Sequence, residues 1–252
     1  MVLESDNDLL RYSRQIMIPQ VGAEGQEQLL NANILIIGMG GLGAPAAIYL
    51  AAAGIGHLIL VDFDEVDLSN LQRQIVHTTT DIGRPKVESA KESLLSLNPD
   101  IEITTINRKL STKEMGAEIK KADVVLDCSD NFTTRFAVND SCVQHNTPLV
   151  SGAAIRMEGQ ISVFRPDHED TPCYHCLYKG GNELDESCTQ TGVLAPLVGI
   201  IGSMQALEAM KIVMNIGETL NGKLMLLDAL TMEWRTLKLP RDPKCPTCGE
   251  HD

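Results

Sequence analysis

Four cysteines of the chain stand in two Cys-x-x-Cys pairs, a spacing that is typical of metal ligands. The first pair is Cys173 and Cys176, and the second is Cys245 and Cys248. Together they offer the four thiolates of a closed, tetrahedral zinc site. The second pair contains the proline and glycine of a tight turn, and neither pair opens a thioredoxin-like βα unit, which argues against a redox role. We therefore expect one structural Zn²⁺, with the intervening His175 exposed and not coordinating.

The sequence GMGGLG at positions 38–43 follows a short apolar, β-branched run and precedes an apolar segment of helical character. Such a turn lets the backbone approach a phosphate at the N-terminus of a helix. Asp62 ends the next apolar run, about 20 residues further on, where an acidic residue commonly holds a ribose. The pattern predicts a nucleotide site but does not by itself separate NAD from ATP. Its glycines are Gly38, Gly40, Gly41 and Gly43.

Two basic residues, Arg73 and Lys86, follow the predicted ribose acid at short intervals, with Asn70 close by. Two cations near one phosphate site favour a triphosphate, because each can neutralise part of its charge. The alternative is that both are solvated charges at helix ends. ATP is therefore the favoured nucleotide, and an NAD-dependent dehydrogenase is the first rival hypothesis.

Asp130 follows the apolar run 124–126, which we expect to be the fourth strand of a sheet. Ligands of open α/β sheets bind at the carboxyl ends of the strands, and a carboxylate facing a triphosphate favours Mg²⁺. Asp130 is therefore a candidate magnesium ligand, with Asn131 beside it in the expected nucleotide site. The competing interpretation is that Asp130 only caps the helix that begins near Asn131, although the two roles can coexist.

Strand-like and helical segments alternate along the chain and must position these residues. Strand-like runs cover 33–37, 57–61, 101–106, 124–126 and 149–150, and helical stretches cover 86–97, 112–120 and 133–143. The alternation predicts an α/β fold with a Rossmann-like, doubly wound, mainly parallel sheet. After Gly152, strand-like pieces at 160–164, 223–227 and 234–239 predict a mixed C-terminal extension of that sheet.

The longest uncharged apolar stretch covers residues 192–207. It is shorter than the roughly 20 residues of a bilayer span and is soon followed by Glu208 and Lys211. We expect a helix that ends near residue 214 and is buried in protein instead of lipid.

Composition argues against several classes of partner. The 252 residues carry 21 basic and 34 acidic side chains, a net charge of −13. No cluster of lysine or arginine could neutralise a nucleic acid or an anionic membrane, so neither is an expected partner. The N-terminus has no basic region followed by an apolar stretch, so no signal peptide is expected. The odd number of cysteines favours metal ligation over disulfides, and we expect a cytoplasmic protein.

Longer strings of the sequence resemble one enzyme family. They are DFDEVDLSNLQRQ at 62–74, GRPKVESAKESLLSLNP at 83–99, LDCSDNFTTRFAVND at 126–140 and VSGAAIRMEGQISVF at 150–164, besides GMGGLG and the cysteine pairs. From about residue 9 to 249 the chain resembles the ubiquitin-activating-like adenylyltransferases of the HesA/MoeB/ThiF type. The resemblance implies a homodimer that uses ATP to adenylate the C-terminal carboxylate of a ubiquitin-like sulfur carrier ending in Gly-Gly.

The resemblance also implies roles for individual residues. Asp130 matches the family's magnesium-binding and catalytic carboxylate. Arg14 matches an arginine that reaches the ATP phosphates of the other subunit, although by itself it is only a cation on a helix surface. Positions that match the family's nucleotide- and phosphate-binding residues are Gly41, Asp62, Ser69, Asn70, Arg73 and Lys86.

The resemblance implies one adenylation domain over residues 1–252, with an ATP-binding half at 1–152 and a carrier- and zinc-binding half at 153–252. Small residues at 152–154 would leave room for the carrier's tail. The string SGAAIRMEGQ favours the small subunit of molybdopterin synthase as the carrier, and the thiamine-biosynthesis carrier is the alternative. Since the chain ends at Asp252 without the rhodanese domain of some relatives, we expect a separate sulfur donor. A non-catalytic carrier-binding scaffold is the second rival hypothesis.

Cys188 stands before the long apolar stretch, at a position that resembles the cysteine used by relatives for a thioester or a sulfur linkage. A thiol at a helix N-terminus has a lowered pKa and is reactive, which makes a covalent role plausible. The alternative is a buried thiol without a role, because adenylation as such needs none. Cys128 and Cys142 are expected to be core residues.

Overall fold

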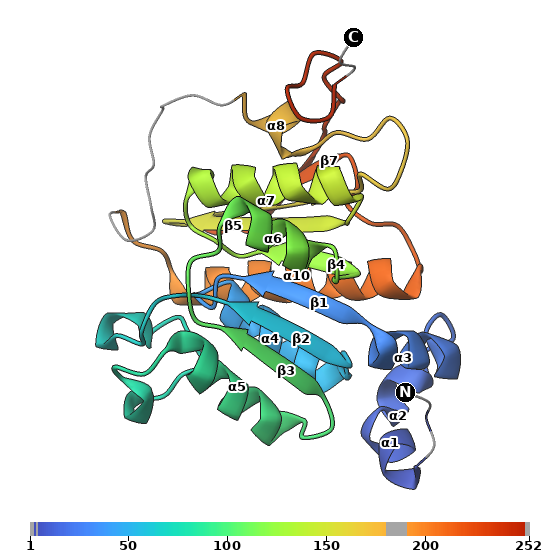
Figure 1. The fold of residues 1–252 in the computed structure, drawn as a ribbon, viewed down its shortest axis with the longest axis vertical. Coiled ribbons are helices and arrows are strands. Elements are labelled where there is room, and N and C mark those ends of the chain that lie inside the picture. The colour runs from blue at the N-terminus through green and yellow to red at the C-terminus, as the bar shows by residue number, and fades with distance from the viewer. Residues whose placement is uncertain (1–2, 4, 180–190, 250–252) are drawn as a thin grey trace.

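The computed structural model describes residue 3 and residues 5–179 and 191–249. Its strands form a single sheet of eight, in the order β3-β2-β1-β4-β5-β6-β7-β8 (Figure 1). The strands are β1 (Asn33–Ile37), β2 (His57–Val61), β3 (Glu102–Ile106), β4 (Val124–Asp127), β5 (Leu149–Ile155), β6 (Glu158–Phe164), β7 (Lys223–Asp228) and β8 (Glu233–Lys238). The helices are α1 (Asp6–Arg11), α2 (Ser13–Ile16), α3 (Gly22–Asn31), α4 (Gly43–Ala53), α5 (Lys86–Leu97), α6 (Thr112–Ile119), α7 (Phe132–His145), α8 (Tyr174–Leu177) and α10 (Ala195–Met214), with short 3-10 helices η1 (Leu68–Asn70) and η2 (Thr79–Asp81).

The sheet is parallel in its first half and antiparallel in its second. Strands β3, β2, β1, β4 and β5 are parallel neighbours, whereas β5, β6, β7 and β8 pair antiparallel. Parallel strands bring their carboxyl ends to one edge, where the segments after β1, β2, β3 and β4 meet. The predicted α/β fold, with its mainly parallel sheet and mixed C-terminal extension, is confirmed.

Strands β1, β2 and β4 in the middle of the parallel half are buried on both faces, which explains their mostly apolar sequence. Side chains alternate across the pleat, so that in β1 Ile34 and Ile36 face one core and Leu35 and Ile37 face the other. The first core also includes residues of α4, α5 and α10, and the second includes residues of α6 and α7. The layers are therefore helix, sheet and helix (Figure 1).

Helix α10 is the only helix among the described residues that is long and apolar enough to cross a membrane. In this structure it packs against α4, β5 and β6, and Leu197, Ile201 and Ala209 are at most 1 % exposed. This position confirms the expectation that the stretch forms a helix buried in protein.

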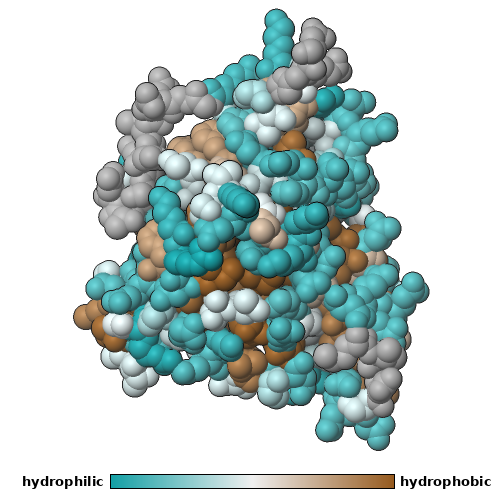
Figure 2. All heavy atoms as spheres, viewed as in Figure 1, coloured by the Kyte–Doolittle hydropathy of each residue, from teal (hydrophilic) through white to brown (hydrophobic). Residues whose placement is uncertain are grey.

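The observed boundaries of some elements differ from the predicted ones, because the hydrophobic pattern of the sequence does not define them. Strand β5 continues to Ile155 because it pairs with β6 along its whole length, including four small residues at 151–154 that carry no strand signal. Helices α1, α2 and α3 precede the first strand and have no counterpart among the predicted elements. Most of the face seen in Figure 2 is hydrophilic, and hydrophobic residues show there in smaller patches.

Candidate functional site

The glycine-rich turn joins the end of β1 to the start of α4. Gly38 has a φ of +94°, and a Cβ at this position would lie 2.8 Å from the carbonyl oxygen of Cys128. A Cβ on Gly43 would lie 1.9 Å from the carbonyl oxygen of Gly38. The backbone therefore requires both glycines. Gly38, Gly40 and Gly41 line a cavity of about 650 Å³ at the carboxyl edge of the sheet, whereas Gly43 begins α4 and supports the turn.

Asp62 follows β2 directly and ties its end to the glycine turn. Its Oδ2 accepts a hydrogen bond from the backbone N–H of Met39 at 2.7 Å, and its Oδ1 accepts one from Asp64 at 2.9 Å. Burial raises the pKa of Asp62, although Lys86 and the two backbone donors oppose that rise. Because each carboxylate oxygen can accept more than one hydrogen bond, Asp62 can still bind a hydroxyl group in the cavity.

Lys86 is the first residue of α5 and lines the same cavity, yet it is only 5 % exposed. Its Nζ lies 2.9 Å from Oδ2 of Asp64, whose side chain is 54 % exposed. The interpretation of Lys86 as a solvated charge at a helix end is therefore wrong. A cation held at a cavity wall can attract an anionic ligand more strongly than a freely solvated one.

Arg73 and Asn70 line the cavity beside Lys86, but Ser69 does not. Arg73 is half-buried, and its Nη1 donates to the carbonyl of Ser69 at 3.1 Å. The Ser69 hydroxyl donates to Oδ1 of Asp67 at 2.6 Å, while Asn70 accepts a hydrogen bond from the Asp67 backbone. Asp67 thus organises the turn that carries these residues, and Ser69 supports it.

Asp130 is exposed at the end of the loop after β4, and Asn131 begins the helix that follows. Asn131 is the N-cap of α7, because its Oδ1 accepts a hydrogen bond from the backbone N–H of Thr134 at 2.9 Å. The interpretation of Asp130 as a helix cap is therefore wrong. Its carboxylate accepts a long hydrogen bond from Nδ2 of Asn131 at 3.4 Å, and it faces the cavity with Asn131.

The structure places further polar residues around this cavity that the sequence patterns do not single out. Arg108, Lys109 and Thr112 come from the segment after β3, Gln74 follows η1, and Arg135 is on α7. The first three could have been found, because the segment after β3 ends at the same sheet edge as the segments after β1 and β2. The result is a glycine turn surrounded by cations and carboxylates, an arrangement suited to a nucleotide with several phosphates.

A second cavity of about 530 Å³ adjoins the first. Asp130, Arg135 and Ala154 line both cavities. The second cavity extends from these residues over β5, β6, β7 and β8, and residues on its wall include Ala153, Gln160, Tyr174, Tyr178 and Leu226. A chain end that entered the second cavity could therefore reach the first.

The idea that Gly152 leaves room for such a chain end is wrong. Gly152 is buried, and a Cβ at this position would lie 2.4 Å from Oε1 of Gln205 on α10. Gln205 is fully buried, and its Nε2 donates to the carbonyls of Asp127 and Val150 at 2.9 and 3.2 Å. Gly152 therefore makes room for a side chain that fastens α10 to the sheet. Ala153 and Ala154 do line the second cavity.

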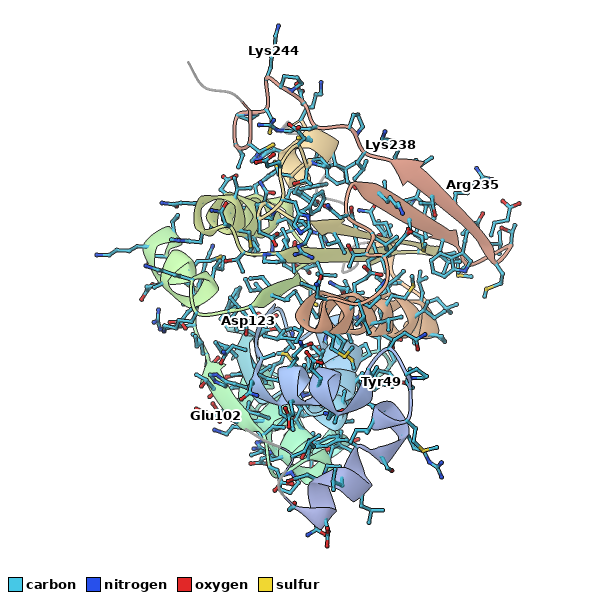
Figure 3. All side chains as sticks on the ribbon, turned by 90° about the vertical axis from the view of Figure 1, so that its right-hand side faces the viewer. Tyr49, Glu102, Asp123, Arg235, Lys238 and Lys244 are labelled. Atoms are coloured by element: carbon cyan, nitrogen blue, oxygen red, sulfur yellow. The ribbon has the colours of Figure 1, made fainter. Side chains whose placement is uncertain are left out.

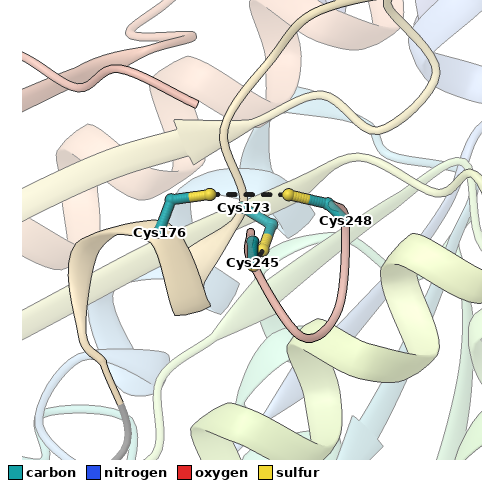
Figure 4. A group of neighbouring side chains, drawn as sticks. All are labelled: Cys173, Cys176, Cys245 and Cys248. Atoms are coloured by element: carbon teal, nitrogen blue, oxygen red, sulfur yellow. Dashed lines mark hydrogen bonds between the residues drawn. The ribbon is translucent and has the colours of Figure 1, made fainter. Parts of the chain in front are cut away.

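The four cysteines of the two pairs lie together at the end of the molecule that contains α8 and the C-terminal segment (Figures 1 and 4). Their Sγ atoms are all within 4.8 Å of one another, and the Cys173–Cys245 and Cys176–Cys248 distances are 3.5 and 3.4 Å. A disulfide would require about 2 Å. Zinc bound tetrahedrally by sulfur at about 2.3 Å separates the sulfurs by roughly 3.8 Å, so the four residues fit a zinc site.

His175 is not exposed, contrary to expectation. Its side chain is 15 % exposed, and its ring stacks on that of Phe136 at a centroid distance of 4.3 Å. Its Nδ1 lies 2.7 Å from the Thr247 hydroxyl and 3.2 Å from Oδ1 of Asp140. His175 therefore links α8, α7 and the C-terminal turn without joining the cysteine cluster.

The remaining cysteines and Arg14 complete the candidate residues. Cys128 and Cys142 are buried as expected, and burial raises the pKa of both thiols. Cys188 lies outside the described residues. Arg14 is exposed on α2 and is not among the residues that line either cavity of its own chain. The structure thus brings together every other predicted polar residue of the nucleotide site except Ser69.

Comparison with known proteins gives one family and several close relatives. The model of the ThiF family matches residues 12–247. The chain is 48 % identical over 246 residues to the molybdopterin-synthase adenylyltransferase of Escherichia coli (strain K12), covering 98 % of both chains. It is 47 % identical over 245 residues to the sulfur carrier protein ThiS adenylyltransferase of the same strain, covering 97 % of both.

More distant proteins share the fold. The SAMP-activating enzyme E1 of Haloferax volcanii is 45 % identical over 242 residues, which are 95 % of this chain and 88 % of that protein. Among solved structures, E. coli MccB with ATP superposes with a TM-score of 0.84 at 25 % identity, covering 98 % of this chain and 75 % of that one.

Proposed function

The chain belongs to the ThiF family, and from this premise we propose that it uses ATP to adenylate the C-terminal glycine carboxylate of a ubiquitin-like sulfur carrier. One observation carries the proposal: two cavities, one lined by the glycine turn, Asp62, Arg73 and Lys86, meet at Asp130. ATP would occupy the first cavity and the carrier's tail the second. A dehydrogenase or a non-catalytic scaffold would not explain why the two cavities meet at Asp130. Relatives of high identity are named adenylyltransferases.

The reaction is an in-line displacement at the α-phosphorus of ATP. A carboxylate oxygen of the carrier forms a bond to this phosphorus, the bond to the bridging oxygen breaks, and pyrophosphate leaves with the electron pair. Positioning and neutralisation of charge are the main requirements of such a step. Arg73 and Lys86 would bind the phosphates, the turn 38–43 with Asn70 and Asn131 would hold the nucleotide, and Asp62 would hold the ribose.

Asp130 would hold Mg²⁺. The fit rests on its exposed carboxylate, which is a hard oxygen ligand with a long hydrogen bond and which lines both cavities. When bound, the cation would neutralise charge on the phosphates.

The second cavity would hold the extended Gly-Gly end of the carrier. Ala153 and Ala154 offer the small side chains that a backbone needs to pass close to β5. A side chain on either terminal residue would have to fit the junction at Asp130, Arg135 and Ala154. This restriction would favour glycine in the carrier.

A homodimer would complete the site. Arg14 is exposed on α2 and lines neither cavity of its own chain, so it would reach the phosphates only from a second copy. Exposed apolar residues near it, Leu10 at 75 % and Met17 at 70 %, provide surface for such a contact.

The cysteine cluster would hold one structural Zn²⁺, since all four positions of a tetrahedron are filled by sulfur. Residues 1–152 and 153–252 would be the ATP-binding half and the carrier- and zinc-binding half of one domain. Cys188 would have a covalent role, a separate protein would donate the sulfur, and the enzyme would be cytoplasmic.

The small subunit of molybdopterin synthase is the carrier that we favour. Relatives named for it are 48 %, 47 % and 49 % identical to this chain. The thiamine-pathway carrier is the second candidate, because the relative named for ThiS is 47 % identical.

The test is carrier-dependent exchange of labelled pyrophosphate into ATP, run with both carriers side by side. We expect exchange only when a carrier with a free C-terminal carboxylate is present, and a higher kcat/KM with the molybdopterin-synthase subunit. Absence of exchange with every Gly-Gly carrier, while NAD binds in calorimetry, would overturn the proposal.

A further inference from the structure

Arg135 is a buried cation at the junction of the two cavities. It lies in the first turns of α7 and is 7 % exposed, yet it lines both cavities. In the part of the chain that the structure describes, its one hydrogen bond within normal geometry runs from Nη2 to the carbonyl of Ser129 at 2.7 Å. A guanidinium has five N–H donors, so this cation keeps donors available for a ligand.

The fully buried carboxylate of Asp127 favours the charged form of Arg135 and lines neither cavity. Burial alone would lower the pKa of Arg135, but attraction to Asp127 and to Tyr174 outweighs that cost and the pKa is raised. Asp127 is 0 % exposed at the end of β4 and lines neither cavity. Its Oδ1 accepts hydrogen bonds from the Ser129 hydroxyl and backbone N–H, at 2.6 and 3.0 Å. Asp127 therefore attracts Arg135 without occupying the wall of either cavity.

The hydroxyl of Tyr174 lies beside the Arg135 guanidinium, and no acceptor for its proton is present among the described residues. Tyr174 is 1 % exposed on α8, lines the second cavity, and its Oη is buried without a partner that meets normal geometry. A tyrosine hydroxyl is both a donor and an acceptor, so this group can donate a hydrogen bond to a ligand in the second cavity. Leaving a buried hydroxyl without an acceptor is unfavourable, and an acceptor in the cavity would remove that cost.

The outer end of the second cavity carries acidic side chains, opposite in sign to Arg135. Glu158, Asp228 and Glu233 are exposed and form one row across β6, β7 and β8, because they are partners in the strand register. Arg235 also lines this cavity, forms an ion pair with Glu233 at 2.8 Å and attracts Asp228, and Figure 3 shows it at the outer edge of the sheet. Three carboxylates and one guanidinium leave the described part of the rim with a net negative charge. An anionic group in this cavity is therefore repelled at the rim and attracted toward Arg135.

We propose that Arg135, assisted by the Tyr174 hydroxyl, binds the terminal carboxylate of the carrier and positions it for attack on the α-phosphorus. The inference rests on the proposed function and adds a residue to it. A planar guanidinium and a hydroxyl donor match the two oxygens of a carboxylate. One carboxylate oxygen held by Arg135 would leave lone pairs of the group directed toward the nucleotide cavity.

The test is a double-mutant cycle between Arg135 and the carboxylate itself. The probes are the molybdopterin-synthase small subunit with its free C-terminus and the same subunit with a C-terminal carboxamide, and calorimetry measures binding of each to Arg135→Gln and to the unmodified enzyme. We expect the unmodified enzyme to prefer the carboxylate by about tenfold or more and Arg135→Gln to lose the preference. Arg165→Gln is the matched control, since Arg165 is also mostly buried, pairs with Asp167 and lines neither cavity.

Two further variants keep the proposal testable if Arg135→Gln folds poorly. Arg135→Lys should retain part of the preference through its charge, and Tyr174→Phe should reduce the preference several-fold while retaining its aromatic packing. Equal weakening of both probes in Arg135→Gln, or an unchanged preference in a folded Arg135 variant, would overturn the role of Arg135 even if pyrophosphate exchange supports the proposed function. If the unmodified enzyme binds neither probe and exchanges no pyrophosphate, the proposed function fails and this role fails with it.

Discussion

The ammonium of Lys86 lies 2.9 Å from the carboxylate of Asp64, and the two residues differ sharply in exposure. Lys86 is buried at the first position of α5, whereas Asp64 is half-exposed in the loop after β2. The pair holds a cation at the wall of the first cavity, so the charge is in place before any ligand binds. Preorganised charges of this kind lose little reorganisation energy when they bind a phosphate.

Removal of this cation should abolish activity with little effect on folding. Lys86→Ala leaves Asp64 half-exposed and hydrated, and Asp62, which loses the attraction of Lys86, keeps its hydrogen bonds from the backbone of Met39 and Asp64. We expect pyrophosphate exchange to fall by about 10²-fold or more, with a thermal midpoint close to that of the unmodified protein. Lys121→Ala is the control, because Lys121 is an exposed lysine paired with Glu118 away from both cavities. Exchange within threefold of normal in Lys86→Ala would remove Lys86 from the mechanism.

Asp130 and Asn131 are adjacent and both line the first cavity, but only Asn131 should contribute to the stability of α7. Asp130→Ala removes no helix cap, so it should abolish exchange and its magnesium dependence without lowering the thermal midpoint. Asn131→Ala removes the cap of α7 and should lower stability by about 1 kcal/mol. Thermal melts and exchange assays on both variants check this contrast. A stability loss in Asp130→Ala as large as that in Asn131→Ala would contradict the assignment of the cap.

The sequence patterns predicted the fold, and most of the polar residues that they predicted for the nucleotide site line the first cavity, because both depend on local rules. Apolar runs of β-branched residues formed β1, β2 and β4, and the residues after them lie at one edge because parallel strands share direction. Two features could not be predicted. The pairing of Lys86 with Asp64 depends on where α5 begins relative to β2, and the position of Arg135 depends on how α7 packs over the sheet. Such contacts join elements that no local pattern relates.

The expectation that Gly152 leaves room for the carrier's tail was wrong because another long-range contact fills that space. A glycine in a strand signals a close approach, but the sequence does not say by what. Here the neighbour is Gln205 of α10, more than 50 residues away. The second cavity itself is formed by β5, β6, β7 and β8, and its outline follows from an antiparallel register that the short strand-like runs did not define.

His77 should make the protein less stable in mild acid. It is 5 % exposed, with Nδ1 2.8 Å from the Ser89 hydroxyl, and burial lowers its pKa below the ordinary value of about 6.5. Between the lowered pKa and 6.5 the unfolded chain binds more protons, so the stability contributed by neutral His77 is present above pH 6.5 and lost as pH falls. We expect the difference in thermal midpoint between the unmodified protein and His77→Gln to shrink from pH 7.5 to pH 5. A difference that does not change over this range would contradict the assignment.

Removal of zinc should lower stability before it affects catalysis. The cysteine cluster joins α8 to the C-terminal turn, while Lys86 and Asp130 line a cavity that none of the four cysteines lines. Metal analysis should give one Zn²⁺ per chain, and a chelator should lower the thermal midpoint. At a temperature where the chelated protein remains folded, ATP affinity should be retained. Protein isolated without denaturation and without zinc, at an unchanged thermal midpoint, would contradict this prediction.

Arg14 should act on the site of the other subunit, and mixing of inactive variants tests this directly. Arg14→Ala and Asp130→Ala homodimers should each be inactive. If Arg14 acts in trans, a heterodimer contains one site with both Asp130 and a neighbouring Arg14, and one site with neither. Random exchange of subunits makes half of the dimers mixed, so about a quarter of normal exchange activity should return. If Arg14 acted within its own chain, each site of the heterodimer would lack one of the two residues and no activity would return. Each variant mixed with itself is the control, and no recovery after subunit exchange has been verified by mass spectrometry would rule out the trans arrangement.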